Sequence, residues 1–261
     1  MSVIGVLKRS LVIIRENPII LGITFILALL GTPGATLQGI TPESILSLLP
    51  RILLYALLMI LIMPFFMAGI LGMIREARKT GATSLPTFTR EGKESYVRLL
   101  LGYVLFLIII AVTAGISFGG IFIAPIILQP LHPIATLVAM IVMVIAMTLI
   151  PVIVLIFILF FDVGIVLSGY GVIESFKKSF GFVRSKFVSV VGYNVLQIFI
   201  FFVLTIPSFM MTLPAAQNML VTANSELAAT IVSNLLFTTL SGAILYTFHA
   251  VFYAEYALGV K

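Results

Sequence analysis

Six long stretches without Asp, Glu, Lys or Arg constrain this chain more than any other feature. A helix that crosses the hydrocarbon core of a bilayer needs about 20 mainly apolar residues. A soluble fold could not bury a chain of 261 residues that is 61% hydrophobic and 9% charged. We therefore predict an all-α, polytopic membrane helix bundle that forms one integral membrane domain over residues 1–261. Its six predicted spans are 18–37, 52–74, 99–121, 133–161, 187–213 and 227–253.

Glycine and proline predict irregularities inside these spans. The fourth span is longer than a bilayer requires, so we expect it to tilt or to bend at Pro151. The Gly31-Thr32-Pro33-Gly34 sequence can end the first span early. The first span is therefore the least regular of the six predicted helices.

The basic residues fall almost entirely on one side of the predicted spans. Fourteen of the fifteen Lys and Arg residues lie on that side, and Arg51 lies on the other. Short loops rich in Lys and Arg remain in the cytoplasm. We expect a cell-membrane protein with both termini in the cytoplasm, and a loop over residues 75–96.

Two further segments, about 3–15 and 171–186, are predicted to be basic amphipathic helices in the membrane interface. A helical wheel places their apolar side chains on one face and their cations opposite. The predicted apolar faces are Val3, Ile4, Leu7, Leu11 and Ile14 in the first, and Val172, Phe176, Phe180, Val183 and Phe187 in the second. The predicted lipid headgroup contacts are Lys8, Arg9, Arg15, Lys177, Lys178 and Arg184.

These two segments resemble each other in sequence. Leu7-Lys8-Arg9-Ser10 matches Phe176-Lys177-Lys178-Ser179 at a constant offset of 169 residues. The third hairpin, over the third and fourth spans, also follows a basic stretch. The pattern indicates a degenerate parallel repeat, although any two basic interfacial helices share some likeness.

A known family carries a similar pattern over about 25 residues. There a span ends in an acidic residue, and a basic pair and a serine precede the next span, as do Asp162, Lys177-Lys178 and Ser179 here. In this respect the chain resembles the membrane domain associated with some glycerophosphodiester phosphodiesterases and related multi-pass prokaryotic proteins. The resemblance implies fold and topology. It implies no catalytic residue, because in that family the membrane domain is not the catalytic part.

One sequence motif raises the possibility of catalysis. Gly115-Ile116-Ser117-Phe118-Gly119 fits the G-x-S-x-G nucleophile elbow, and His132 with Glu43 or Glu226 could complete a triad. The elbow requires a strand before the serine, whereas this serine falls in a predicted span. We expect helix packing to be the role of these small residues.

Polar residues inside the last two spans allow a second hypothesis. The predicted stripe consists of Asn194, Gln197, Asn234, Thr238, Ser241 and His249. Such groups either line a solute or proton path, in which His249 would titrate, or form interhelical hydrogen bonds. We favour hydrogen bonding. Asp162 and Glu255, near span ends, are expected to pair with Lys177, Lys178 or Lys261.

The sequence indicates a non-enzymatic membrane protein that organises or senses lipid or supports a membrane complex. The absence of cysteine excludes disulfides and thiolate metal sites, and no cofactor motif is present. We expect anionic membrane lipids as partners and no nucleic acid, and a protein partner or homo-oligomer remains open. The alternative is a small-solute transporter or channel that uses the polar stripe.

Overall fold

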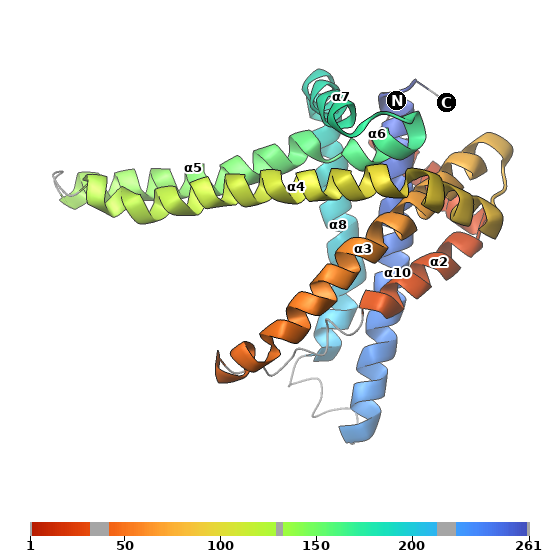
Figure 1. Cartoon of the computed structure of the whole chain (residues 1–261), viewed down its shortest axis with the longest axis horizontal. Coiled ribbons are helices and arrows are strands. Elements are labelled where there is room, and N and C mark those ends of the chain that lie inside the picture. Colours follow the sequence, from red (N-terminus) through yellow and green to blue (C-terminus); the bar gives the residue numbers. More distant parts are fainter. Residues whose placement is uncertain (1, 32–41, 129–132, 213–222, 260–261) are drawn as a thin grey trace.

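The computed structural model describes residues 2–31, 42–128, 133–212 and 223–259, and these residues form helices with short connections and no strand. The predicted all-α membrane bundle is therefore confirmed. Figure 1 shows the arrangement. The helices are α1 (Val3–Glu16), α2 (Ile19–Gly31), α3 (Pro42–Thr80), α4 (Leu85–Leu128), α5 (Pro133–Ile158), α6 (Phe161–Ser168), α7 (Val172–Ser185), α8 (Phe187–Thr212) and α10 (Ala223–Tyr256).

Five of these helices are long and apolar enough to cross a membrane on their own. A sixth crossing requires α1 and α2 to count together, although they meet at 91°. The helix predicted over 18–37 ends at Gly31, as the glycine and proline residues there allow, and residues 32–41 lie outside the described residues. Its 13 residues extend only about 20 Å, which is less than the hydrocarbon thickness.

The buried core lies at one end of the molecule, which we call the hub. The hub comprises α1, α6 and α7 and the parts of α2, α3, α4, α8 and α10 that pack around them. From there the α4–α5 pair diverges from the α8–α10 pair, and both termini lie at the hub (Figure 1). The apolar windows of α4, α5 and α8 are only 11%, 6% and 11% buried, against 50% in α3 and α10. The exposed apolar surface of the diverging helices is suited to lipid rather than to water.

Residues 75–96, predicted to be a loop, are helical except for the short connection between α3 and α4. α3 continues to Thr80 and α4 begins at Leu85, and Gly81 adopts a positive φ of 83° in the turn. The two helices cross closely because Gly69 and Gly72 of α3 lie directly against Phe88 and Glu91 of α4. The prediction of a loop failed because it assumed that the helices end where charged residues begin. Here α3 and α4 continue as helices beyond their apolar spans.

The fourth predicted span is interrupted at Leu159 and Phe160 rather than at Pro151, which lies inside α5. Ser179 of α7 occupies this break. Its hydroxyl donates to the carbonyl of Phe157 at 2.8 Å and accepts from the amide of Phe160 at 3.1 Å. Both backbone groups are therefore satisfied without a continuous helix.

The two amphipathic segments are equivalent in structure as well as in sequence. α1 and α7 each contain 14 residues, and both their first and their last residues lie 169 positions apart. The helix that follows each begins within three residues of its end. This correspondence supports the repeat that the sequence pattern indicates.

Candidate functional site

An aspartate, a histidine and a tyrosine form a hydrogen-bonded chain inside the hub. Asp162 of α6 lies with its Oδ1 atom 3.2 Å from Nε2 of His249 in α10. The Nδ1 atom of His249 lies 2.7 Å from the hydroxyl of Tyr193 in α8. Asp162 and His249 are each 7% exposed, and Tyr193 is fully buried. The chain therefore joins three helices that are distant in sequence.

The donors and acceptors of Asp162, His249 and Tyr193 match one another when His249 is neutral. A neutral His249 can donate from Nε2 to Asp162 while Nδ1 accepts from the Tyr193 hydroxyl. The amide of Val163 also donates to Asp162 Oδ1 at 2.7 Å. A protonated imidazolium would instead form a buried ion pair with Asp162. In either state the imidazole compensates the buried carboxylate.

Aromatic rings enclose the same chain. The ring of Phe160 stacks on His249 with centroids 4.8 Å apart, and the rings of Tyr193 and Phe252 stack at 4.5 Å. Excluding water in this way strengthens the hydrogen bonds and raises the cost of removing either partner. The expected pairing of Asp162 with Lys177 or Lys178 is wrong, because both lysines are exposed while α6 turns Asp162 inward.

Glu255 of α10 binds Arg9 of α1 through two hydrogen bonds. Nε of Arg9 donates to Oε1 at 2.5 Å, and Nη2 donates to Oε2. The Glu255 side chain is 2% exposed and that of Arg9 is 49% exposed. The hydrogen bond to Glu255 raises the pKa of Arg9 in α1, which lies outside the long spans. An ion pair was expected, but its partner is Arg9 rather than Lys177 or Lys178, and Lys261 lies outside the described residues.

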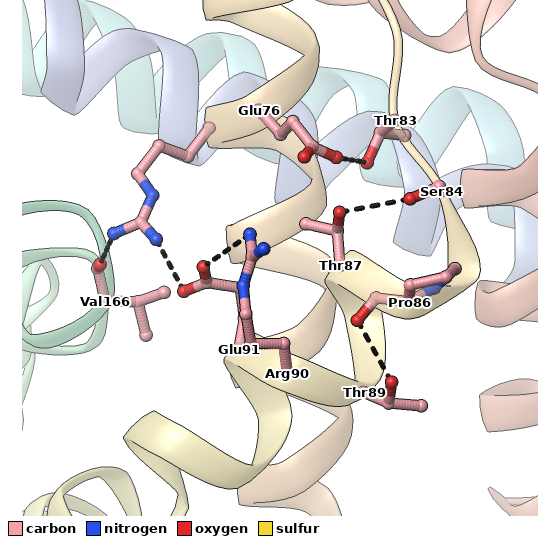
Figure 2. Close-up of polar contacts among 10 residues, drawn as sticks. Glu76, Thr83, Ser84, Pro86, Thr87, Thr89, Arg90, Glu91 and Val166 are labelled. Atoms are coloured by element: carbon pink, nitrogen blue, oxygen red, sulfur yellow. Dashed lines mark hydrogen bonds and ion pairs between the residues drawn. The ribbon is translucent and has the colours of Figure 1, made fainter.

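A third buried carboxylate, Glu91 of α4, pairs with Arg75, which links α3, α4 and α6 (Figure 2). Arg75 Nη2 lies 2.5 Å from Glu91 Oε2, and its Nη1 donates to the carbonyl of Val166 at 2.8 Å. Arg90 approaches the other Glu91 oxygen at 3.4 Å. Both arginines belong to the region expected to be a basic loop. Arg75 instead links three helices of the hub.

The predicted headgroup contacts lie on the outer surfaces of α1 and α7. The side chains of Lys8, Arg15, Lys177, Lys178 and Arg184 are exposed, whereas Arg9 is engaged by Glu255. Lys178 also lies 5.7 Å from the centre of the Tyr170 ring.

The apolar residues predicted on one face of each helix divide between the hub and the outer surface. Ile4 and Leu11 of α1, and Phe180 of α7, are 62%, 44% and 50% exposed. Phe187, the first residue of α8, is also exposed at 51%. The faces that pack on the hub instead centre on Ser10 and Ser179, which are fully buried. The wheel assumes one apolar neighbour, whereas an interfacial helix of a membrane protein meets protein on one side and lipid on another.

The predicted polar stripe is not one uniform interior surface. His249 is buried in the chain with Asp162, but Thr238 is exposed, and Gln197 and Asn234 are half-buried. The Asn194 amide donates to the Val190 carbonyl at 2.8 Å, and Ser241 donates to the Thr238 carbonyl at 3.2 Å. These two groups therefore bond to the backbone of their own helices.

Ser117 lies inside α4 with helical residues before it, so the strand that a nucleophile elbow requires is missing there, and the sequence also favoured packing over this motif. Its side chain is buried and its hydroxyl has no hydrogen-bond partner in the structure. His132 lies outside the described residues, as do the side chains of Glu43 and Glu226. Gly115 and Gly119 face open space, so close packing in this region involves Gly120 and Met147 instead.

A family model described as "Domain of unknown function (DUF7847)" matches residues 1–256. The chain belongs to this family. Curated proteins and solved structures give no match. The family model spans every described helix, so the hub and the diverging spans both belong to the family domain.

Sequence reasoning missed three of the residues that build the hub. The sequence patterns assigned no role to Tyr193, and Arg75 and Glu91 were assigned to a loop. The signal was present in part, because Glu91 lies four residues before the small residue Ser95 and eight before Leu99. Glu91, Ser95 and Leu99 are all buried and share one face at helical spacing.

Proposed function

We propose that this is a non-enzymatic membrane protein that binds anionic lipid at its hub and so organises or senses membrane lipid. The observation that supports the proposal is the outer surface of α1 and α7. Each helix already packs one face on the hub, and each still exposes cations beside apolar side chains. In α1 these neighbours include Ile4 and Leu11, and in α7 they include Ile173 and Phe180.

Such a surface suits the boundary between headgroups and acyl chains. Exposed apolar side chains can enter the acyl region while lysine and arginine reach lipid phosphates. Each cation near an anionic leaflet contributes about 1 kcal/mol of attraction. The hub occupies the faces centred on Ser10 and Ser179, so the apolar side chains that remain exposed on α1 and α7 can enter lipid.

Solute transport receives less support from the same residues. A transport path would need polar groups that face a shared passage between α8 and α10. Asn194 and Ser241 bond to their own helices, and Tyr193 packs among aromatic rings at this interface. We therefore do not propose transport.

The test uses the full chain in detergent, titrated with phosphatidylglycerol or phosphatidylcholine and followed by native mass spectrometry. The variant replaces all five exposed cations, Lys8, Arg15, Lys177, Lys178 and Arg184, with Gln. The variant should lose most of the preference for phosphatidylglycerol and retain its binding of phosphatidylcholine. Arg51→Gln, an exposed cation at the far end of α3, is the matched control and should bind as the wild type does. Equal phosphatidylglycerol binding by wild type and five-cation variant would refute the proposal.

We also propose that the hub faces the cytoplasm at the cell membrane, on the evidence of the distribution of Lys and Arg. The chain contains no cysteine, so single cysteines report position without background. Arg51→Cys should label with an impermeant maleimide on intact cells. Ser185→Cys, exposed at the end of α7, should label only after permeabilisation. The reverse pattern would place the hub outside.

A further inference from the structure

A lysine and a serine recur in three helices at a nearly constant interval. Ser10, Ser95 and Ser179 follow one another at intervals of 85 and 84 residues, and a lysine lies two positions before each. The first and third belong to α1 and α7, the two helices of the recognised repeat. The second belongs to the first turns of α4, which begins the third hairpin.

The burial of these three segments follows the same pattern. Ser10, Ser95 and Ser179 are 0%, 3% and 0% exposed. The residues four before and four after each serine are also buried; they are Val6 and Ile14, Glu91 and Leu99, and Ser175 and Val183. The three lysines Lys8, Lys93 and Lys177 are all exposed. The three helices thus turn the serine to the hub and the lysine outward.

We propose that residues 85–98 of α4 form a third lipid-headgroup segment, in which Lys93 is the counterpart of Lys8 and Lys177. This inference rests on the proposed lipid-binding function and adds a binding residue to it. Val97 is 61% exposed on the same segment, as apolar side chains are exposed beside the cations of α1 and α7. The ligand class is the same, a lipid with an anionic phosphate headgroup.

The third segment differs from the other two in its continuation. α1 and α7 are followed by their C-cap residues, Asn17 and Lys186, seven positions after the serine, and there the chain changes direction. The equivalent residue of α4 is Gly102, and the helix continues straight into its span. A side chain at Gly102 would lie 2.9 Å from Phe161 and 3.0 Å from Ile165, so α6 packs where the other helices end.

The charges around Lys93 also differ from those of its counterparts. Arg9 and Lys178 stand directly before the other two serines, whereas Glu94 stands before Ser95. Glu94 is exposed and repels an anionic headgroup. Arg98 donates to the carbonyl of Gly169 at 3.0 Å, and Arg90 approaches Glu91. Lys93 is therefore the cation of this segment that we assign to the lipid phosphate.

The experiment measures phosphatidylglycerol affinity of the full chain in detergent by native mass spectrometry. Lys8→Gln, Lys93→Gln and Lys177→Gln are compared singly, with Lys79→Gln as control. Lys79 is an exposed cation near the same turn, but it lies outside the recurring positions. One lost cation should weaken binding about fivefold for Lys8 and Lys177, and about two- to fivefold for Lys93. Lys79→Gln should change the affinity less than twofold, and Glu94→Gln should increase it.

The outcomes separate this inference from the proposed function. If Lys8→Gln and Lys177→Gln weaken binding while Lys93→Gln matches Lys79→Gln, the inference is wrong and the proposed function stands. If none of the three weakens binding, the proposed function fails. If Lys79→Gln weakens binding as much as Lys93→Gln, the recurring position has no special role and the inference is again wrong. Circular dichroism of each variant confirms that its helices are intact.

Discussion

Replacing Gly69 with alanine should loosen the crossing of α3 and α4 and lower the stability of the whole hub. A methyl group at this position would lie 2.3 Å from Cδ2 of Phe88 and 2.9 Å from the Phe88 carbonyl oxygen. Ordinary van der Waals contacts begin at about 3.4–4 Å, so the ring and the backbone of α4 must both move. The ring can rotate, but the carbonyl belongs to the α4 backbone and moves only with the helix.

The magnitude follows from two opposing effects. Overpacking a tight contact costs about 1–3 kcal/mol, and a contact with backbone belongs at the upper end of that range. Alanine recovers about 1 kcal/mol of helix propensity relative to glycine. The net loss is then about 2 kcal/mol, which lowers Tm by roughly 4–8 °C for a domain of this size. Thermal unfolding in detergent, followed by circular dichroism, measures this shift.

Gly22→Ala in α2 is the matched control for this prediction. A methyl group there meets nothing within 4 Å, so only the gain in helix propensity remains. We expect an unchanged or slightly higher Tm for this control. If Gly69→Ala proves as stable as Gly22→Ala, the close approach of α3 and α4 does not support the hub, and the reasoning is wrong.

Three further predictions concern the buried polar groups. Arg9→Gln should lower the stability of the folded protein by about 3 kcal/mol, because it leaves the buried Glu255 carboxylate without its cation. Glu255→Gln should lower it by only about 1 kcal/mol. Equal effects of the two variants in thermal unfolding would contradict this asymmetry. Ser179→Ala leaves two backbone groups at the α5–α6 break without a partner, so it should cost about 2 kcal/mol, and Ser10→Ala, which loses one intrahelical bond, less than 1 kcal/mol. Neither the wild type nor Ser117→Ala should react with a fluorophosphonate probe. Stoichiometric labelling of the wild type alone would make this chain an enzyme.

The regular part of the fold follows directly from the sequence. Uninterrupted apolar length predicts the long helices, and amphipathic spacing predicts α1 and α7, because both depend on local patterns along the chain. The ends of α3 and α4 were not predictable in this way. Their polar turns continue as helix because they pack against each other through Gly69 and Gly72, which is a contact between distant residues.

The candidate site was predictable only in its separate members. Asp162, His249 and Glu255 attract notice because ionisable groups are rare in apolar stretches. Their partners depend on which helices meet, and no local pattern contains that information. Arg9 lies 246 residues from Glu255, and Asp162 lies 87 residues from His249. For a related reason the sequence did not show which apolar residues of α1 and α7 pack on the hub and which stay outside it. A helical wheel cannot distinguish protein from lipid as the apolar neighbour.

The contact between Arg9 and Glu255 also has a consequence for how the chain is made. Their separation of 246 residues means that α1 emerges from the ribosome long before its partner in α10 exists. At a synthesis rate of about 5–20 residues per second, this interval is about 12–50 s. Until then Arg9 lacks the carboxylate that holds it in the hub, and α1 has no α10 to pack against. A nascent chain that lacks α10 would leave α1 without its main packing partner, so full assembly of the hub depends on synthesis of that helix.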